Sequence, residues 1–131
     1  MGQASEMTGP NRLQLPRAPN CASMGRRWIE QESGDKLNEA TLNNVKLVAT
    51  ELLNNAYLHG RGQIELGLAP QNECVRVEVI DEGQGIAVKI RQNGPGGGGG
   101  WGLRIVDQLA TAWGAYEGTT HVWAEVPLTS Y

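Results

Sequence analysis

Hydrophobic and polar positions alternate with two different periods along the chain, which indicates both helices and strands. Apolar side chains recur every three or four residues, as in amphipathic helices, over residues 22–31, about 37–59 and 103–110. They recur at every second position, as in half-buried strands, over residues 12–16, 63–69, 74–81, 113–116 and 120–127. This order of elements predicts an α+β fold with a mixed sheet and helices packed on one of its faces.

The length of the chain limits how many domains it can form. Its 131 residues provide one modest hydrophobic core, so we expect a single domain over residues 12–128. Residues 1–11 are expected to be a disordered or tag-like start. No apolar run approaches the roughly 20 residues of a membrane span, and the N-terminus lacks the apolar segment of a signal peptide, so we expect no membrane contact.

Composition excludes several classes of function. The formal net charge of −3 at pH 7 lacks the basic surplus of nucleic-acid-binding domains, so DNA and RNA are not expected partners. Cys21 and Cys74 are the only cysteines, and neither has metal-ligand spacing. We therefore expect neither a disulfide framework nor a zinc site, and a reducing cytoplasm fits this cysteine usage.

The central helix carries two polar sides when it is wound at 100° per residue. An apolar sector predicted to face the core consists of Val45, Ala49, Leu52, Leu53 and Ala56. The opposite sector, predicted to face solvent, consists of Lys46, Thr50, Asn54 and Tyr57. A second polar stripe, between the core sector and the apolar pair Leu47 and Leu58, consists of Asn44, Glu51, Asn55 and His59.

The second stripe is the first candidate for chemistry. Glu51 and Asn55 are four residues apart, so their side chains project from one patch of the helix. A carboxylate among apolar neighbours is costly unless it is paired, and we therefore expect the stripe to line a water-filled functional cavity. The simpler alternative is an edge residue, Glu51, with a local hydrogen bond to Asn55. His59 taken alone is typical of a helix end favoured by the dipole.

A second candidate follows the predicted hairpin. Asp81 ends its second strand, with Gly83 and Gly85 next along the chain. A carboxylate there can accept a hydrogen bond from an exocyclic amine, while the glycines let backbone approach a flat ligand. The alternative is a β-turn that uses Asp and Gly for conformational reasons alone.

The third candidate is glycine-rich. The segment from Gly94 to Gly102 leads directly into the helix that begins near Leu103. Unpaired N–H groups and the positive end of the dipole at such a helix start favour phosphate. The segment matches neither a Walker A loop nor the dinucleotide-binding glycine pattern. A flexible linker is the alternative, although a linker normally joins two domains and only one is expected.

Three motifs in this order resemble the N, G1 and G2 boxes of the GHKL (Bergerat-fold) ATPases: ELLNNAYLHG at 51–60, DEGQGI at 81–86 and GGWGLRIV at 99–106. Within that superfamily the chain is most similar to the RsbW-type anti-sigma-factor serine/threonine kinases. The resemblance covers about residues 12–128. It implies a two-layer α/β sandwich whose mixed sheet is mostly antiparallel.

The resemblance also implies the cofactors ATP and Mg²⁺ and gives roles to individual residues. Glu51 would be the catalytic base, Asn55 would coordinate Mg²⁺, and Asp81 would accept the adenine amino group. The base pocket would be shaped by Gly83, Gly85 and Ile86. Phosphate would be held by backbone amides of Gly99, Gly100, Gly102 and Leu103. The remaining expected nucleotide contacts are His59, Trp101 and Thr120; for Thr120 the neighbouring Thr119 is an alternative, and an ordinary strand threonine is the simpler interpretation.

The implied activity is transfer of the ATP γ-phosphoryl group to a hydroxyl of a protein. The implied partners are an anti-sigma-factor antagonist of the STAS type and a sigma factor, through which transcription would be regulated. Dimerisation through the N-terminal strand and first helix is implied as well. Two alternatives stay open: a non-catalytic protein-binding module gated by ATP or ADP, and a small α/β scaffold in which the glycine run is incidental.

Overall fold

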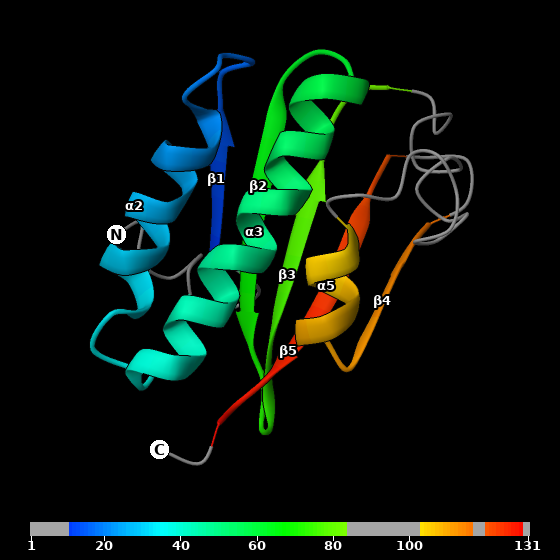
Figure 1. Cartoon of the computed structure of the whole chain (residues 1–131). Coiled ribbons are helices and arrows are strands. Elements are labelled where there is room, and N and C mark those ends of the chain that lie inside the picture. Colours follow the sequence, from blue (N-terminus) through cyan, green and yellow to red (C-terminus); the bar gives the residue numbers. More distant parts are fainter. Residues whose placement is uncertain (1–10, 84–102, 117–119, 130–131) are drawn as a thin grey trace.

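The computed structural model describes residues 11–83, 103–116 and 120–129, which form three helices and five strands (Figure 1). The strands are β1 (Asn11–Leu15), β2 (Ile64–Pro70), β3 (Cys74–Ile80), β4 (Ala112–Ala115) and β5 (Val122–Pro127). The helices are α2 (Cys21–Ser33), α3 (Glu39–His59) and α5 (Leu103–Leu109). Within these ranges no helix has an apolar stretch that could cross a bilayer.

The five strands form one open sheet in the order β1-β2-β3-β5-β4, and every pairing among them is antiparallel. The helices α2, α3 and α5 lie side by side over one face of this sheet, and α3 crosses its middle (Figure 1). The predicted two-layer α+β sandwich with helices on one face is confirmed, whereas the sheet formed by the described strands is antiparallel throughout and not mixed as predicted.

The core lies between the two layers. The predicted apolar sector of α3 is buried throughout and packs against the sheet. The strand residues that face it are also buried: Leu66, Leu68, Val75, Val77, Val79, Val122, Ala124 and Val126. Removing this apolar surface from water is the main force that holds α3 against the sheet. The position of α3, which carries the first candidate stripe, is therefore fixed by its apolar sector.

The sector of α3 predicted to face solvent is only partly exposed. Thr50 is half-buried because α2 lies against this side of α3, where Arg26 Nη1 donates to Thr50 Oγ1 at 3.0 Å. Lys46 is half-buried and paired with Glu30 of α2. Tyr57 packs against the core, whereas Asn54 is exposed as expected. The prediction is wrong for three of these four residues because the pattern of one helix does not show where its neighbour packs.

The N-terminal end of α3 is capped and tied to the end of the chain. Asn38 Oδ1 accepts a hydrogen bond from the Thr41 amide at 2.8 Å, which satisfies one of the N–H groups left unpaired at a helix start. The Thr129 amide donates to Thr41 Oγ1 at 2.9 Å. These contacts fix the end of α3 that lies away from the candidate site.

The face of the sheet without helices carries a network of charged side chains. Arg76 donates to Glu78 Oε2 at 2.8 Å and to Glu125 Oε2 at 3.0 Å, and its guanidinium lies 4.3 Å from the ring centre of Trp123. Glu78 also meets Arg12 Nη2 at 3.5 Å and His121 Nε2 at 3.1 Å. The acids on this face are therefore paired within the chain.

Candidate functional site

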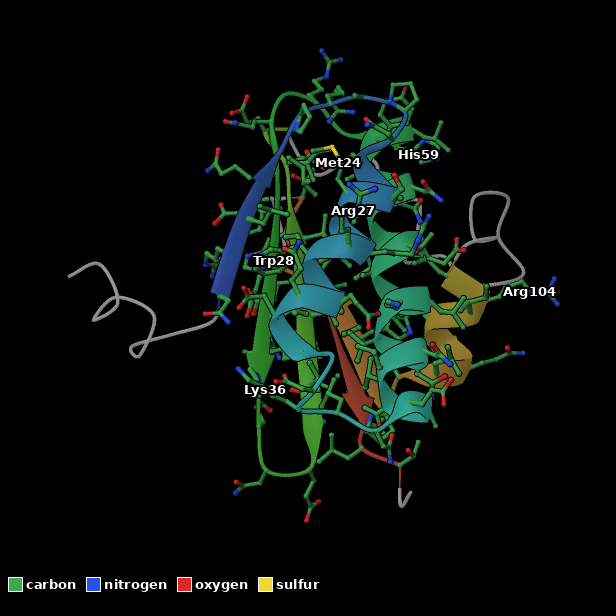
Figure 2. The ribbon with its side chains drawn as sticks, turned by 90° about the vertical axis from the view of Figure 1, so that its left-hand side faces the viewer. Met24, Arg27, Trp28, Lys36, His59 and Arg104 are labelled. Carbon is green, nitrogen blue, oxygen red and sulfur yellow. The ribbon has the colours of Figure 1, made fainter. Side chains whose placement is uncertain are left out.

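The candidate stripe of α3 changes in exposure along its length. Asn55 is only 8% exposed, and its Nδ2 donates to the backbone oxygen of Glu51 at 3.2 Å. Glu51 is half-buried, and burial raises the pKa of its carboxyl group. Asn44 is also half-buried, whereas His59 at the end of the helix is exposed (Figure 2). Asn55 and Glu51 are thus two members of the stripe that lie one helical turn apart and are both shielded from water.

The side chain of Glu51 has no hydrogen bond or ion pair within the described part of the chain. Desolvation by burial raises its pKa, and no charged group among the described residues offsets this effect. The local hydrogen bond from Asn55 reaches the backbone of Glu51 and leaves the carboxylate free. A half-buried carboxylate in this state is suited to accept a proton or a ligand.

Asp81 lies directly after β3 and is 8% exposed. Its Oδ1 accepts hydrogen bonds from the Gly83 amide at 2.7 Å and from the Arg61 amide at 3.4 Å. Its Oδ2 is buried, and no described residue donates to it. Buried carboxylate oxygens are normally paired. Oδ2 is therefore an unusual acceptor, for which the described residues supply no donor.

Thr120 is part of the same cluster. It is 3% exposed, and its Oγ1 donates to the backbone oxygen of Asp81 at 2.8 Å. The hydrogen bond ties the segment before β5 to the end of β3. Thr119, the alternative in register, lies outside the described residues. The geometry gives Thr120 a contact with the Asp81 backbone, and a contact with adenine stays a prediction.

Gly60 brings the end of α3 against Asp81. It follows the last helical residue as the predicted C-terminal cap, but its φ of −90° is open to any residue. The need for glycine comes instead from close approach, because a Cβ at Gly60 would lie 2.2 Å from Asp81 Oδ2 and 2.7 Å from the oxygen of Ala56. The helix that carries Glu51 and the carboxylate that follows β3 therefore meet at this glycine.

The distances along α3 show how the candidates are spread. Asn55 and Glu51 precede Gly60 by five and nine residues, which corresponds to about 8 and 14 Å along the helix axis. The cluster of Asp81, Gly83 and Thr120 lies at one end of this line. An elongated ligand held at Asp81 could therefore extend along α3 past Asn55 to Glu51.

Several predicted site residues lie outside the described ranges: Gly85, Ile86, Gly99, Gly100, Trp101 and Gly102. Leu103 is the first residue of α5, and its side chain is buried in the core. Any role of Leu103 in binding would therefore fall to its backbone. These roles remain predictions.

The residues present are compatible with Mg²⁺ and ATP. Mg²⁺ prefers oxygen ligands and usually takes one or two from the protein and the rest from phosphate and water, so the Asn55 amide with phosphate oxygens fits this preference. No group of three or more His, Cys, Asp or Glu side chains in the described ranges could hold a metal by itself. The free Asp81 Oδ2 suits an amino group. These residues are therefore compatible with a Mg²⁺ ion that takes one ligand from Asn55 and others from the phosphates of a bound nucleotide.

A hollow of about 450 Å³ lies elsewhere, between α2 and α3, and is lined by Arg26, Asn43, Lys46, Leu47 and Thr50. None of the predicted site residues lines it. It gives no support to the predicted site and provides an alternative location against which ligand binding can be tested.

Two further residues, Arg17 and Arg61, contact this region and are marked by no motif in the sequence. Arg61 supplies a backbone amide to Asp81, and Arg17 donates to three backbone oxygens near the end of α3. Neither has a side-chain pattern that marks it, because one acts through its main chain and the other through main-chain oxygens of distant residues.

An open antiparallel sheet, three helices on one face and a stripe on the central helix that ends beside a sheet-end carboxylate define a GHKL-type ATPase fold. The family model described as "Histidine kinase-like ATPase domain" matches residues 16–125. Since this match spans most of the chain, the protein belongs to the histidine kinase-like ATPase domain family.

A solved structure from Mycobacterium tuberculosis, described as the RsbU and RsbW domains of Rv1364c, has a TM-score of 0.65 and 21% sequence identity to this chain. The match covers 91% of this chain and 32% of the other, so this chain spans about a third of that protein's length. No curated protein matches. The fold is therefore GHKL-type and RsbW-like.

Proposed function

We propose that residues 12–128 form one ATP-binding kinase domain, in which the adenine of ATP is held at Asp81 and the phosphates extend along α3. The observation that carries this proposal is Asp81 Oδ2, a buried acceptor to which no described residue donates and which lies beside the C-terminal end of the helix bearing Asn55 and Glu51. Gly83 and Thr120 fix the backbone around this carboxylate. Family membership supports ATP as the ligand.

The proposed reaction is transfer of the γ-phosphoryl group to a serine or threonine hydroxyl of another protein. Glu51 accepts the proton from the attacking hydroxyl, and the raised pKa makes it a stronger base than an exposed glutamate. Asn55 would hold Mg²⁺, which when bound neutralises the charge of the phosphates. The acceptor we propose is an anti-sigma-factor antagonist of the STAS type, with a sigma factor as the second partner; the RsbW-like fold supports this choice.

A phosphotransfer assay with radiolabelled ATP and a candidate antagonist tests the proposal. Label should enter the antagonist with the wild type, and Glu51→Ala should abolish incorporation while ATP binding survives. Glu73→Ala, in the exposed turn between β2 and β3, is the matched control and should label normally. Binding of ATP without labelling by the wild type would favour a non-catalytic, nucleotide-gated module. Absence of ATP binding would refute the proposal.

A further inference from the structure

Arg17 lies in the connection between β1 and α2, and its guanidinium faces the far end of another helix. Nη1 donates to the backbone oxygens of Ala56 at 2.9 Å and Tyr57 at 2.6 Å, and Nε donates to that of Gly62 at 2.9 Å. The last carbonyl groups of a helix lack partners within the helix, and a positive charge there is favoured by the dipole. Arg17 thus joins the last turn of α3 to the segment that follows it.

That segment holds Asp81 in place. The Arg61 amide donates to Asp81 Oδ1 at 3.4 Å, and the Arg61 oxygen accepts from the Glu82 amide at 2.8 Å. Gly60 packs directly against Oδ2. A shift of residues 60–62 would therefore change the orientation of the carboxylate.

The backbone of the segment leaves little room for other arrangements. Gly62 has a φ of +67°, and a Cβ there would lie 2.0 Å from Glu82 Oε1. The left-handed backbone favours glycine, and a Cβ would also lie 2.8 Å from Glu82 Cβ. The segment is therefore packed tightly between Arg17 on one side and residues 81–82 on the other.

We propose that Arg17 is a positioning residue for adenine recognition. By fixing the end of α3 and residues 60–62, it holds Asp81 with Oδ1 engaged by backbone amides and Oδ2 left for the exocyclic amine. This inference rests on the proposed nucleotide site. Arg17 forms no ion pair with a carboxylate among the described residues, so it acts through the backbone and not through charge on Asp81.

A simple helix cap would make the same three hydrogen bonds and would stabilise the fold without affecting which base is bound. Base selectivity separates the two roles. ITP carries a carbonyl oxygen where ATP carries the amino group, so ITP binding does not use Asp81 as a hydrogen-bond acceptor for that group. If Asp81 is no longer held in its orientation, the affinity for ATP should therefore fall and the affinity for ITP should stay almost unchanged.

The test measures the affinities of ATP and ITP, with Mg²⁺, for the wild type, Arg17→Met, Arg17→Lys and Arg26→Met. Met removes all donors but retains an unbranched stem. Arg26 is the matched control, because this arginine also contacts α3 through a side-chain hydrogen bond, to Thr50, and in the described structure it has no hydrogen bond to residues 60–62. Hydrogen exchange at the amides of Arg61 and Gly83 in the nucleotide-free protein gives a second readout.

We expect Arg17→Met to lower the affinity for ATP about tenfold and to change the affinity for ITP by less than about twofold. A tenfold loss is the effect of losing roughly one hydrogen bond to a charged group. The amides of Arg61 and Gly83 should exchange faster in this variant. Arg17→Lys should restore part of the selectivity, since lysine keeps the charge but not the fork of donors. Arg26→Met should keep the ratio of ATP to ITP affinities of the wild type.

An unchanged ratio in Arg17→Met, with a lowered melting temperature, would overturn the inference and leave Arg17 as a helix cap. If Arg17→Met does not fold, Arg17→Lys decides in the same way: a reduced ratio supports the inference and an unchanged ratio refutes it. A wild type that binds ATP no better than ITP would refute the proposed function itself, and this inference with it. The two failures are therefore distinguishable.

Discussion

Buried carboxylates have complete sets of partners in one region of the molecule and incomplete sets among the described residues in another. On the open face of the sheet, Glu78 is 9% exposed and is paired with Arg76, Arg12 and His121, and hydrogen bonds from Arg76 and His121 lower its pKa against the effect of burial. Three residues further along the chain, Asp81 is equally buried, but one of its oxygens has no donor among the described residues.

Glu51 on α3 resembles Asp81 in this respect. Its side chain has no partner among the described residues, and burial raises its pKa. The difference teaches that burial alone does not identify a functional acid. A buried acid whose hydrogen bonds are complete stabilises the fold, whereas one with an open acceptor position is prepared for a ligand.

The largest effect should come from Glu51→Ala. General base catalysis contributes about 10²–10⁴-fold, so phosphotransfer should fall by that factor. Nucleotide binding should remain, because Asp81 and Asn55 are untouched. Rates of label transfer and ATP titrations on the same preparation measure both. Retained transfer would remove Glu51 from the proposed chemistry.

Asp81→Asn should weaken ATP binding about 10–100-fold, since an amide replaces a charged acceptor and brings a donor beside the adenine amino group. Calorimetric titration measures the change. The matched control is Glu82→Gln, which changes the exposed neighbour of Asp81 and should bind ATP as the wild type does. Equal loss in both variants would indicate an effect of net charge and not of a specific acceptor.

Glu78→Gln should lower the free energy of unfolding by about 1–3 kcal/mol, because the amide has no negative charge and places an NH2 donor against arginine donors at a buried position. ATP binding should not change, since Glu78 lies on the face opposite the helices. Denaturant unfolding measures the first quantity. The control is Glu65→Gln. Among the described residues the Glu65 carboxylate pairs with Arg12 alone, at 3.4 Å and partly exposed, so this substitution should lower the free energy of unfolding by about 0–1 kcal/mol. An ATP defect in Glu78→Gln would break the division between the two regions.

The smallest effect concerns pH and has opposite signs in the two regions. Because the pKa of Glu78 is lowered, its contribution to stability is present above the ordinary glutamate pKa and is lost as pH falls through the folded pKa. Because the pKa of Glu51 is raised, its contribution is present below the ordinary glutamate pKa and is lost as pH rises through the folded pKa.

At neutral pH, Glu51→Gln should therefore be slightly more stable than the wild type in the absence of nucleotide, and Glu78→Gln less stable. Both differences should shrink on acidification. Unfolding curves recorded between about pH 4 and 7, which includes the range in which glutamates titrate, measure both stability differences. Two differences of the same sign at neutral pH would contradict the contrast.

The fold could be predicted from sequence because its two periodicities are strong. The apolar sector of α3 and the alternation in β2 and β3 decide which faces are buried, and both faces are buried as predicted. The exposure of Lys46, Thr50 and Tyr57 could not be predicted, because it depends on how α2 packs against α3.

The candidate site was predictable only where side-chain type carries the signal. The carboxylate at a strand end predicts Asp81, and the polar stripe predicts Glu51 with Asn55; their roles stay predictions. Gly60 was expected as a helix cap, but its close contact with Asp81 is tertiary. Arg17 and Arg61 were missed because their contacts are to or from the main chain, which no residue pattern records.

The central claim is that Asp81 receives the base of a nucleotide whose phosphates run along α3. A crystal structure with a non-hydrolysable ATP analogue and Mg²⁺ tests it most directly. We predict that the adenine amino group donates to Asp81 Oδ2 and that Asn55 contacts the metal. An analogue bound in the hollow between α2 and α3, with Asp81 Oδ2 still without a donor, would contradict the claim.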